Sequence, residues 1–592
     1  MIIILKINGN STMNKKILII VLLTIGVGQA LRAQTVFFNG LGRAIVTNDR
    51  LKGPVLNGGS TLPKDTTSAR NSTGGYTLFD LGVNIQPNES FRGSVILRVR
   101  NEFGAFYGQG ASLAFRQLRI EGLAGKKVKY QLGDIDMGLT PYTIFNPDEV
   151  YHDYEADIFG IRRKIVHYEN FNYGNKWRVQ GGDVNTNLIF TRGIEKIKFR
   201  LFGARIKKNN QLANIPDRVF YGGRLEVVQS KYLQLGGNLI NTTDLQGTVP
   251  DTLYNFKDEV VTGDYRFTLD MDKIILAAYG ELGYSNYVYN KKVSDTTVKH
   301  NDYFYDLGIS GAIKPLGIKL IASYRNIGSG FFSPVAQTRR IFDYGTPTIF
   351  GNLQNVNDPN SGSTRIPTLF DRYSQEGLYN PSISTVLMPF LPQYNNVTPY
   401  GPATPNRKGV TFSIEKSDTA HIFKADVKTE ILSEIVGEGT AATRKFLAAR
   451  GGFSLNINKI VKFKRSFGIT FGARYEHTTR ATSSIDLSSL LLDAGLNFEV
   501  IKNLDLLVGY KLLNALGNEY LSQRNSFNNI TGTPLVVNIN QQQGIWALGG
   551  RYNFNNNAFF TIQGHMVHFN NNKNNTLNYN MNQLFFNYTI VF

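Results

Sequence analysis

Residues 583–592 read Gln-Leu-Phe-Phe-Asn-Tyr-Thr-Ile-Val-Phe. Successive side chains of a β-strand point to opposite faces, so residues two apart share a face. One face of this stretch is wholly apolar or aromatic and carries Leu584, Phe586, Tyr588, Ile590 and Phe592. The other face mixes polar and apolar side chains. The stretch therefore predicts a strand that has one face in an apolar environment.

This pattern resembles the closing strand of bacterial outer-membrane β-barrels, in which apolar positions alternate and the last residue is Phe. The terminal strand of a soluble sandwich can carry the same pattern, so the decision depends on the rest of the chain. The resemblance implies that Tyr588, Ile590 and Phe592 form an assembly signal that the barrel-insertion machinery reads. It also implies that Phe592 lies at the periplasmic rim.

The N-terminal residues predict export. Met13 begins the sequence Met-Asn-Lys-Lys, an apolar run follows at 17–27, and Ala-Leu-Arg-Ala precedes Gln34. These are the charged region, the apolar region and the cleavage site of a secretory signal. We expect residues 1–33 to be the signal peptide, with Met13 as the more natural start. After Gln34 no uncharged apolar run approaches the roughly 18 residues of a membrane helix, so a chain that spans the membrane must form a closed barrel.

Composition agrees with many short strands. The 592 residues include 58 Gly, 30 Tyr and 39 Phe, and they include no Cys, which excludes disulfides and thiolate metal sites. The formal charge is +19, and removal of the four basic residues in 1–33 leaves +15. For an exported protein this balance favours anionic solutes, lipid headgroups or acidic partner surfaces, and we expect no nucleic-acid partner.

Runs of about ten alternating residues recur along the chain, which is the length that a tilted strand needs to cross a bilayer. The connectors between them alternate in length when the chain is followed backwards from Phe592. Long connectors lie at 570–582, 516–543, 479–486 and 432–445, and short ones at 555–557, 501–503, 459–465 and 417–419. The alternation reaches the start of the chain if 161–170 is not a spanning strand.

These patterns predict an all-β fold in the outer membrane. We expect residues 34–592 to form one antiparallel up-and-down transmembrane β-barrel of about 22 strands, within a range of 18–24. Long loops would lie outside and short turns in the periplasm. Irregular insertions are expected at 138–175 and 329–407. The second holds ten of the 19 prolines and is long enough to be a functional or capping loop.

A basic lumen is the best-supported candidate site. Ten basic residues fall on the polar faces of predicted strands: Arg92, Arg98, Arg100, Lys198, Arg200, Lys319, Arg325, Arg474, Lys511 and Arg551. Rings of Arg and Lys bias a pore toward anions. Alternatively, several of these residues pair with lumenal carboxylates such as Glu102 or Glu476 and stiffen the wall.

An acidic cluster in and before the first insertion is a second, weaker candidate. It consists of Asp134, Asp136, Asp148, Glu149, Asp153, Glu155 and Asp157. This density of carboxylates suits a hard cation such as Ca²⁺, but the spacing is not that of an EF-hand. Pairing with a basic barrel wall explains the same residues. We expect neither a bound metal nor a cofactor, and no hydrolase or metalloprotease motif predicts an enzyme.

The sequence therefore predicts a porin-like channel for passive or substrate-biased passage of small, anionic solutes. The alternative is a non-transporting barrel that serves as a subunit of a larger outer-membrane complex for secretion, protein assembly or surface attachment. The size of 329–407 motivates this alternative. Outer-membrane lipid and the barrel-insertion machinery are the expected partners, together with complex subunits or further copies of the chain in a homo-oligomer.

Overall fold

The computed structural model describes residues 35–57, 68–104, 110–125, 127–148, 152–172, 174–212, 214–249, 254–291, 296–342, 367–418, 422–481 and 485–592. The expected signal peptide at 1–33 and the acidic candidate Glu149 lie outside these residues.

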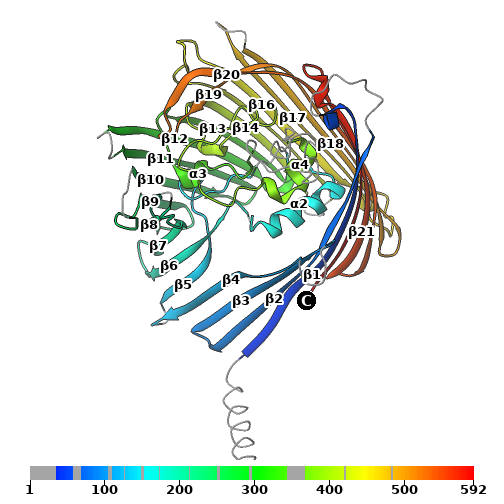
Figure 1. Ribbon diagram of the computed structural model, residues 1–592. Helices are drawn as coiled ribbons and strands as arrows, with labels where there is room; N and C mark the ends of the chain where they lie inside the picture. The colour runs from blue at the N-terminus through cyan, green and yellow to red at the C-terminus, as the bar shows by residue number, and fades with distance from the viewer. Residues whose placement is uncertain are drawn as a thin grey trace, which may run out of the picture.

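The chain forms a closed antiparallel barrel of 22 strands (Figure 1). Each strand pairs with the next one along the chain, and β1 pairs with β22 to close the sheet. The strands are β1 (Thr35–Lys52), β2 (Arg70–Asn88), β3 (Phe91–Glu102), β4 (Ala111–Ala124), β5 (Val128–Met137), β6 (Trp177–Ile189), β7 (Lys196–Lys207), β8 (Arg218–Val228), β9 (Leu233–Asp244), β10 (Tyr254–Asp270), β11 (Ile274–Lys291), β12 (Thr296–Ile313), β13 (Ile318–Ile327), β14 (Arg407–Ser417), β15 (Phe423–Ser433), β16 (Lys445–Asn456), β17 (Phe467–Arg480), β18 (Ile485–Ile501), β19 (Leu504–Arg524), β20 (Ile530–Asn555), β21 (Ala558–Asn571) and β22 (Tyr579–Val591). The predicted fold class and strand number are confirmed.

Helices are few and short. They are α2 (Asp157–Glu169), α3 (Pro334–Gln337), α4 (Leu369–Ser374) and α5 (Ile457–Ile460), with 3-10 turns η2 (Pro54–Asn57), η4 (Lys314–Leu316), η5 (Glu376–Leu378), η6 (Gly401–Ala403) and η7 (Asn575–Leu577). In the described part of the chain, no helix is long and apolar enough to cross a membrane.

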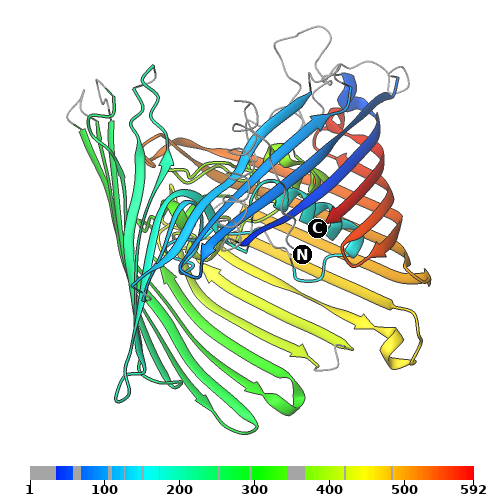
Figure 2. The same cartoon turned by 90° about the horizontal axis from the view of Figure 1, so that it is seen from below.

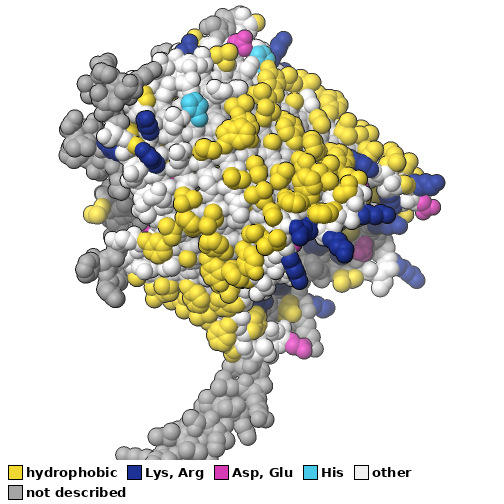
Figure 3. All heavy atoms as spheres, turned by 90° about the vertical axis from the view of Figure 1, so that its right-hand side faces the viewer, with side chains coloured by type: hydrophobic (Ala, Val, Ile, Leu, Met, Phe, Trp, Pro, Cys, Tyr) yellow, Lys and Arg dark blue, Asp and Glu magenta, His cyan; other side chains and the backbone are white. Residues whose placement is uncertain are grey.

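The outside of the barrel is apolar. Along β22, Leu584 and Tyr588 are exposed, whereas Phe585 and Asn587 between them are buried against the interior. The same alternation on other strands leaves a broad hydrophobic band on the outer surface, with Lys and Arg along one margin (Figure 3). Apolar side chains remain on such a surface when their solvent is lipid, so the chain folds as an outer-membrane-type β-barrel.

Phe592 lies at the closing seam. Its carbonyl oxygen accepts a hydrogen bond from the Gly40 amide at 2.8 Å, and its amide donates to the Gly40 carbonyl at 3.1 Å. Its ring stacks on Phe79 with the ring centroids 5.6 Å apart. A Cβ at residue 40 would come within 2.5 Å of that ring, so the seam needs glycine on β1.

Two expected irregular regions are structured. Residues 516–543, predicted as a long loop, belong to the extended ends of β19 and β20, and only 525–529 connect the strands. This hairpin has no lipid-facing stripe at its tip, which is why its sequence resembles a loop. The insertion at 138–175 contains the 13-residue helix α2. Ile158, Ile161 and Ile165 lie three and four residues apart and form its buried face.

Both insertions fold into the lumen rather than outward. Figure 1 shows α2, α3 and α4 inside the ring of strands, and Figure 2 shows the same arrangement from below. We call the described parts of 138–176 and 328–406 the plug. Phe159 of α2 and Phe370 of α4 pack on one side of the wall with Phe585, and Phe331 packs on the other side with Phe304. The plug thus contacts both sides of the barrel.

Polar anchors fix α2 to the wall. At its end, Glu169 accepts hydrogen bonds from Arg43 of β1 at 2.7 Å and from Tyr76 of β2 at 2.7 Å. Before its start, Glu155 pairs with Arg163 at 2.8 Å and with Lys511 of β19. Burial would raise the pKa of Glu155, but these two cations hold it well below its usual range.

Candidate functional site

The hairpin of β19 and β20 bends over the external mouth of the barrel, as both ribbon views show (Figures 1 and 2). We call residues 519–535 the lid. At its tip, Phe527 packs edge-on against Tyr289 of β11 with the ring centroids 4.9 Å apart. Asn528 accepts a hydrogen bond at 3.2 Å from the amide of Leu387 in the plug. The lid therefore contacts both the opposite wall and the plug.

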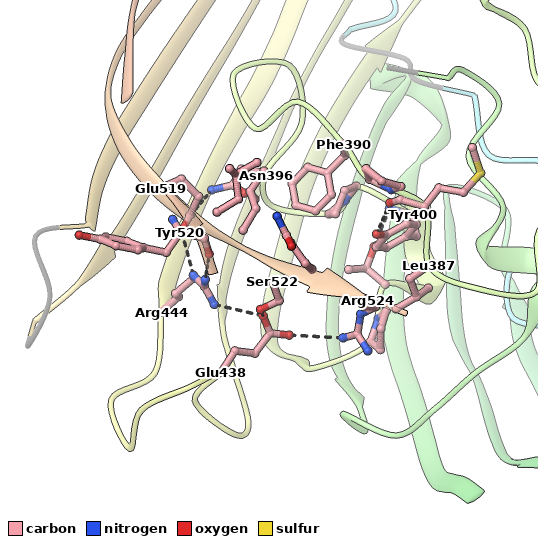
Figure 4. A pocket seen from close by; sticks show the side chains of 18 of the residues that line it. Leu387, Phe390, Asn396, Tyr400, Glu438, Arg444, Glu519, Tyr520, Ser522 and Arg524 are labelled. Carbon is pink, nitrogen blue, oxygen red and sulfur yellow. Dashed lines mark hydrogen bonds and ion pairs between the residues drawn. The ribbon is translucent and has the colours of Figure 1, made fainter. Parts of the chain in front are cut away.

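Beneath the lid lies a cavity of about 450 Å³, which we call the outer pocket (Figure 4). The plug contributes Phe390 and Tyr400, the wall contributes Phe446, and the lid contributes Leu521 and Leu535. This volume falls within the range of small-molecule sites, and apolar walls with a few polar groups are typical of them.

The polar groups of the outer pocket neutralise one another. Three arginines face three glutamates, namely Arg407, Arg444, Arg524, Glu434, Glu438 and Glu519. Arg444 joins the wall to the lid, because it lies 2.5 Å from Glu434 and 3.0 Å from Glu519. Burial opposes the charge of Glu438, but Ser522, Arg444 and Arg524 outweigh it and hold the pKa of Glu438 below its usual range. The outer pocket therefore has no net charge.

A strap of the plug, residues 394–402, forms the inner side of the outer pocket, and we call it the septum. Its backbone carbonyls are held by buried arginines: Arg407 donates to Val397 at 2.8 Å, and Arg339 donates to Pro399 at 3.0 Å. Arg474 of β17 donates to the carbonyl of Tyr394. The septum is therefore tied to the wall and to the plug at several points.

On the other side of the septum lies a second cavity of about 240 Å³, which we call the inner cavity. Pro399 lines both spaces, so the septum is their common wall. Five cations and three carboxylates line the inner cavity: Arg325, Arg339, Arg340, Lys428, Arg450, Asp148, Asp153 and Glu430. Unlike the outer pocket, the inner cavity carries a formal excess of two positive charges.

The wall strands concentrate this charge. Lys428 of β15 is directly opposite Arg450 of β16, which is directly opposite Arg474 of β17. The next row on the same face carries Glu430 and Glu476, separated by Ala448. Like charges directly opposite each other on neighbouring strands repel, so a row of three cations favours counter-charge beside it. Glu430 supplies part of it, at 3.1 Å from Lys428.

All ten basic residues predicted from the sequence lie on the lumenal face, and each is within 4 Å of a carboxylate. The pairs are Arg92–Glu121, Arg98–Asp80, Arg100–Glu169, Lys198–Glu226, Arg200–Asp183, Lys319–Glu415, Arg325–Glu430, Arg474–Glu476, Lys511–Glu155 and Arg551–Asp505. Arg325 alone of the ten also lines the inner cavity, although Arg474 stands in the adjoining row. The ten predicted cations are thus paired with carboxylates of the wall or the plug, and the inner cavity is where cations outnumber the carboxylates beside them.

The described acidic candidates do not converge on one point. Asp136 pairs with Arg178 of β6 at 2.6 Å, and Asp134 accepts the amide of Leu118 at 2.6 Å. Asp148 lies 3.1 Å from Arg340. Asp157 accepts from Asn497. Glu155 is held by the pairs described above, and Asp153 lines the inner cavity. Among the described residues, no group of three or more His, Asp or Glu is arranged to hold a metal ion.

Two histidines of the first insertion, the buried His152 and the half-buried His167, have lowered pKa values. His152 accepts the amide of Tyr154 at its Nδ1, and burial, reinforced by Lys511, lowers its pKa to about 3. His167 of α2 lies 4.0 Å from Asp148, and burial lowers its pKa to about 4 despite that carboxylate. Protonation of either ring would place an extra cation inside the plug.

Sequence reasoning missed most of the inner cavity. Arg339 and Arg340 lie in an insertion without periodicity, so nothing in their neighbourhood predicts a lumenal position. Lys428 alternates with Val427 on a predicted strand, and the same signal that selected Arg325 could have selected it. The sequence predicts the residues of the lid as a loop, whereas most of them lie in β19 and β20.

Comparison with known proteins finds similarity only to solved structures of low sequence identity. No family model matches the chain, and no curated protein matches it. The copper transporter OprC is 8% identical, with coverage of 93% of this chain and 80% of that chain and a TM-score of 0.48. The translocation pore of the P pilus usher PapC is 9% identical, covering 93% and 99%, with a TM-score of 0.34. A BenF-like porin from Pseudomonas fluorescens Pf-5 is 9% identical, covering 94% and 99%, with a TM-score of 0.33.

Proposed function

We propose that this protein is a porin-like channel of the outer membrane whose plug and lid restrict passage to small solutes, with a preference for anions. A solute enters the outer pocket from the side of the lid, passes the septum and reaches the inner cavity. From there it leaves toward the periplasm. The lid and the septum are the two barriers on this route.

The observation that carries the proposal is the inner cavity. It lies inside a closed barrel, it shares the septum with an outer pocket, and its lining holds five cations against three carboxylates. A site with net positive charge and low-dielectric walls raises the local concentration of anions. Small carboxylates and phosphate esters are therefore the favoured solutes.

Because the ten predicted cations are paired with carboxylates, the preference for anions depends mainly on the inner cavity. Cations paired with carboxylates repel neither sign of ion strongly, and the outer pocket is neutral. The selective step therefore lies at the inner cavity, where Arg339 and Arg340 of the plug oppose the wall cations Lys428 and Arg450. Arg340 also pairs with Asp148 at 3.1 Å, so the two insertions of the plug share charge at the inner cavity.

The alternative function, a non-transporting subunit of a larger complex, was suggested by the size of 329–407. The described residues of this segment pack in the lumen and line both cavities. Occlusion of the lumen is therefore a sufficient reason for their presence. We favour the channel on this ground.

Liposome swelling and planar-bilayer recording test the proposal. We expect stepwise conductance from the purified barrel, and faster swelling in an isotonic small carboxylate than in a neutral sugar of similar size. The absence of both conductance and liposome swelling, even when Phe527 is substituted to open the lid, would contradict the channel. That outcome would favour the complex-subunit alternative.

A further inference from the structure

The turn between β16 and β17 differs from the other periplasmic turns. It spans ten residues, 457–466, and starts with helix α5, whereas the other periplasmic connections have two to six residues. We call it the rim finger. Figure 2 shows it as a short golden helix at the periplasmic ends of the strands. Its fold is held internally, since the amide of Phe463 donates to the carbonyl of Asn458 at 2.9 Å.

The rim finger is basic and exposed. Lys459, Lys462, Lys464 and Arg465 all have exposed side chains, and residues 457–466 contain no Asp or Glu. Glu499 of β18 is the neighbouring carboxylate, and it accepts the amide of Ser466 at 3.2 Å. Four cations beside one carboxylate leave the finger with excess positive charge.

The rim finger also exposes apolar side chains between its cations. Ile460 is 54% exposed, Val461 64% and Phe463 46%. The ring of Phe463 stacks on Phe498, with the ring centroids 6.4 Å apart, and Phe498 belongs to the outward-facing apolar stripe of β18. The apolar surface of the finger is therefore continuous with the lipid-facing surface of the barrel.

We propose that the rim finger is a binding site for anionic phospholipid in the periplasmic leaflet. Its cations contact the lipid phosphates, and Ile460, Val461 and Phe463 insert at the boundary between headgroups and acyl chains. Alternation of basic and apolar side chains along a short exposed segment suits an interface that has charge on one side and hydrocarbon on the other. Contact of Phe463 with lipid-facing Phe498 favours lipid over a periplasmic protein, because a protein partner would have to cover part of the membrane surface.

A cysteine introduced into the rim finger can be labelled specifically, because the chain contains no other Cys. Val461→Cys is labelled with an environment-sensitive fluorophore, and the folded barrel is placed in nanodiscs of phosphatidylcholine. A fixed mole fraction of either brominated phosphatidylcholine or brominated phosphatidylglycerol is then included. We expect the anionic lipid to quench the label about twofold more strongly, because it is enriched around the finger.

Removing the positive charges of the rim finger should remove the difference in quenching between the anionic and the zwitterionic lipid. In K459Q/K462Q/K464Q/R465Q the two brominated lipids should quench equally. Since Arg465 also donates to the carbonyl of Val500, the triple variant K459Q/K462Q/K464Q is tested beside it and should lose most of the difference. Heat-modified mobility on gels confirms that each variant is folded.

A matched control removes four lysines from other periplasmic turns and strand ends: Lys231, Lys273, Lys314 and Lys416, each changed to Gln. It should keep the preference of the label for anionic lipid. Equal quenching in the parent protein, or an equal loss in this control, would overturn the site. A label that neither brominated lipid quenches would place the finger outside the membrane and would favour a protein partner instead.

Discussion

Phe527 in the lid packs against Tyr289 of β11, although eight strands, β12 to β19, separate β11 from β20 around the barrel. A hairpin tip can reach so far only by crossing the external mouth. It rests there on the plug, through Asn528 and Leu387. The lid therefore crosses the mouth, and we expect entry into the outer pocket to require this contact to open.

Cross-linking the lid should close the channel. In a Phe527→Cys/Tyr289→Cys protein, which has no other cysteine, a short bis-methanethiosulfonate, which links the two thiols through reducible disulfides, should reduce the conductance at least several-fold. A reductant that cleaves the link should restore it. Each single-cysteine protein treated in the same way is the control and should be unaffected. Unchanged conductance after complete cross-linking would show that solutes do not pass beneath the lid.

Loosening the septum should have the opposite effect. Arg407 is buried, and its guanidinium donates to Val397 at 2.8 Å and to Asn396 at 3.3 Å. Arg407→Leu removes these bonds and should raise the single-channel conductance or the open probability several-fold. Lys198→Gln changes a lumenal cation that does not line either cavity and should leave both unchanged. Equal behaviour of the two variants would argue against the septum as a barrier.

Acidification should favour the open channel. In the closed state burial lowers the pKa of His152 from 6.5 to about 3 and that of His167 from 6.5 to about 4. We expect the plug to loosen around these histidines, with Arg339 and Arg340 still at the inner cavity, when the channel opens. Both rings are then exposed, so the open state binds more protons as pH falls from 6.5 toward 4. The closed state is thereby disfavoured by at most about tenfold per pH unit for each histidine. The open probability should rise between pH 7 and pH 5.

The histidines can be tested directly. His152→Gln/His167→Gln should flatten this pH dependence, because glutamine does not titrate. His167 is also surrounded by Asp148, Arg163 and Arg340, so charge on those groups sets the size of its contribution. An equally steep rise in the double variant would assign the pH dependence to other groups.

The closing seam should tolerate no side chain at residue 40. In Gly40→Ala the new Cβ would lie 2.3 Å from the carbonyl oxygen of Asp80 and 2.5 Å from the ring of Phe592. Such overpacking costs about 1–3 kcal/mol, so the folded, heat-modifiable form should decrease. Gly93→Ala meets no atom within 4 Å and is the matched control. Deletion of Phe592 should likewise lower the folded amount in membranes before it alters permeability.

The barrel itself could be predicted because its determinants are local. Alternation along stretches such as 583–592 marks a lipid-facing strand wherever it occurs, and the length of each connector reports the side on which it lies. The ion pairs of the lumenal cations could not be predicted from alternation alone, because they depend on the register between strands. Arg98 and Asp80 are both on polar faces in the sequence, but only the register of β2 and β3 shows that they are opposite each other.

The plug could not be predicted in the same way. Residues 329–407 have no period, and Arg339 and Arg340 are lumenal only because α3 and the septum pack against distant strands. Helix α2 was more accessible, because the spacing of Ile158, Ile161 and Ile165 is helical. The lid was predicted as a loop, although it is a strand hairpin. Its residues lack the alternating lipid-facing stripe that marks the other strands.

Ion selectivity decides whether the inner cavity gives the channel its preference for anions. The reversal potential in a salt gradient across a planar bilayer should show that wild-type channels prefer chloride to potassium. Lys428→Gln/Arg450→Gln leaves three cations against three carboxylates in the inner cavity and should reduce the anion-to-cation permeability ratio by about twofold or more. A cation-selective wild-type channel, or a ratio that the double substitution does not change, would show that the inner cavity does not select anions.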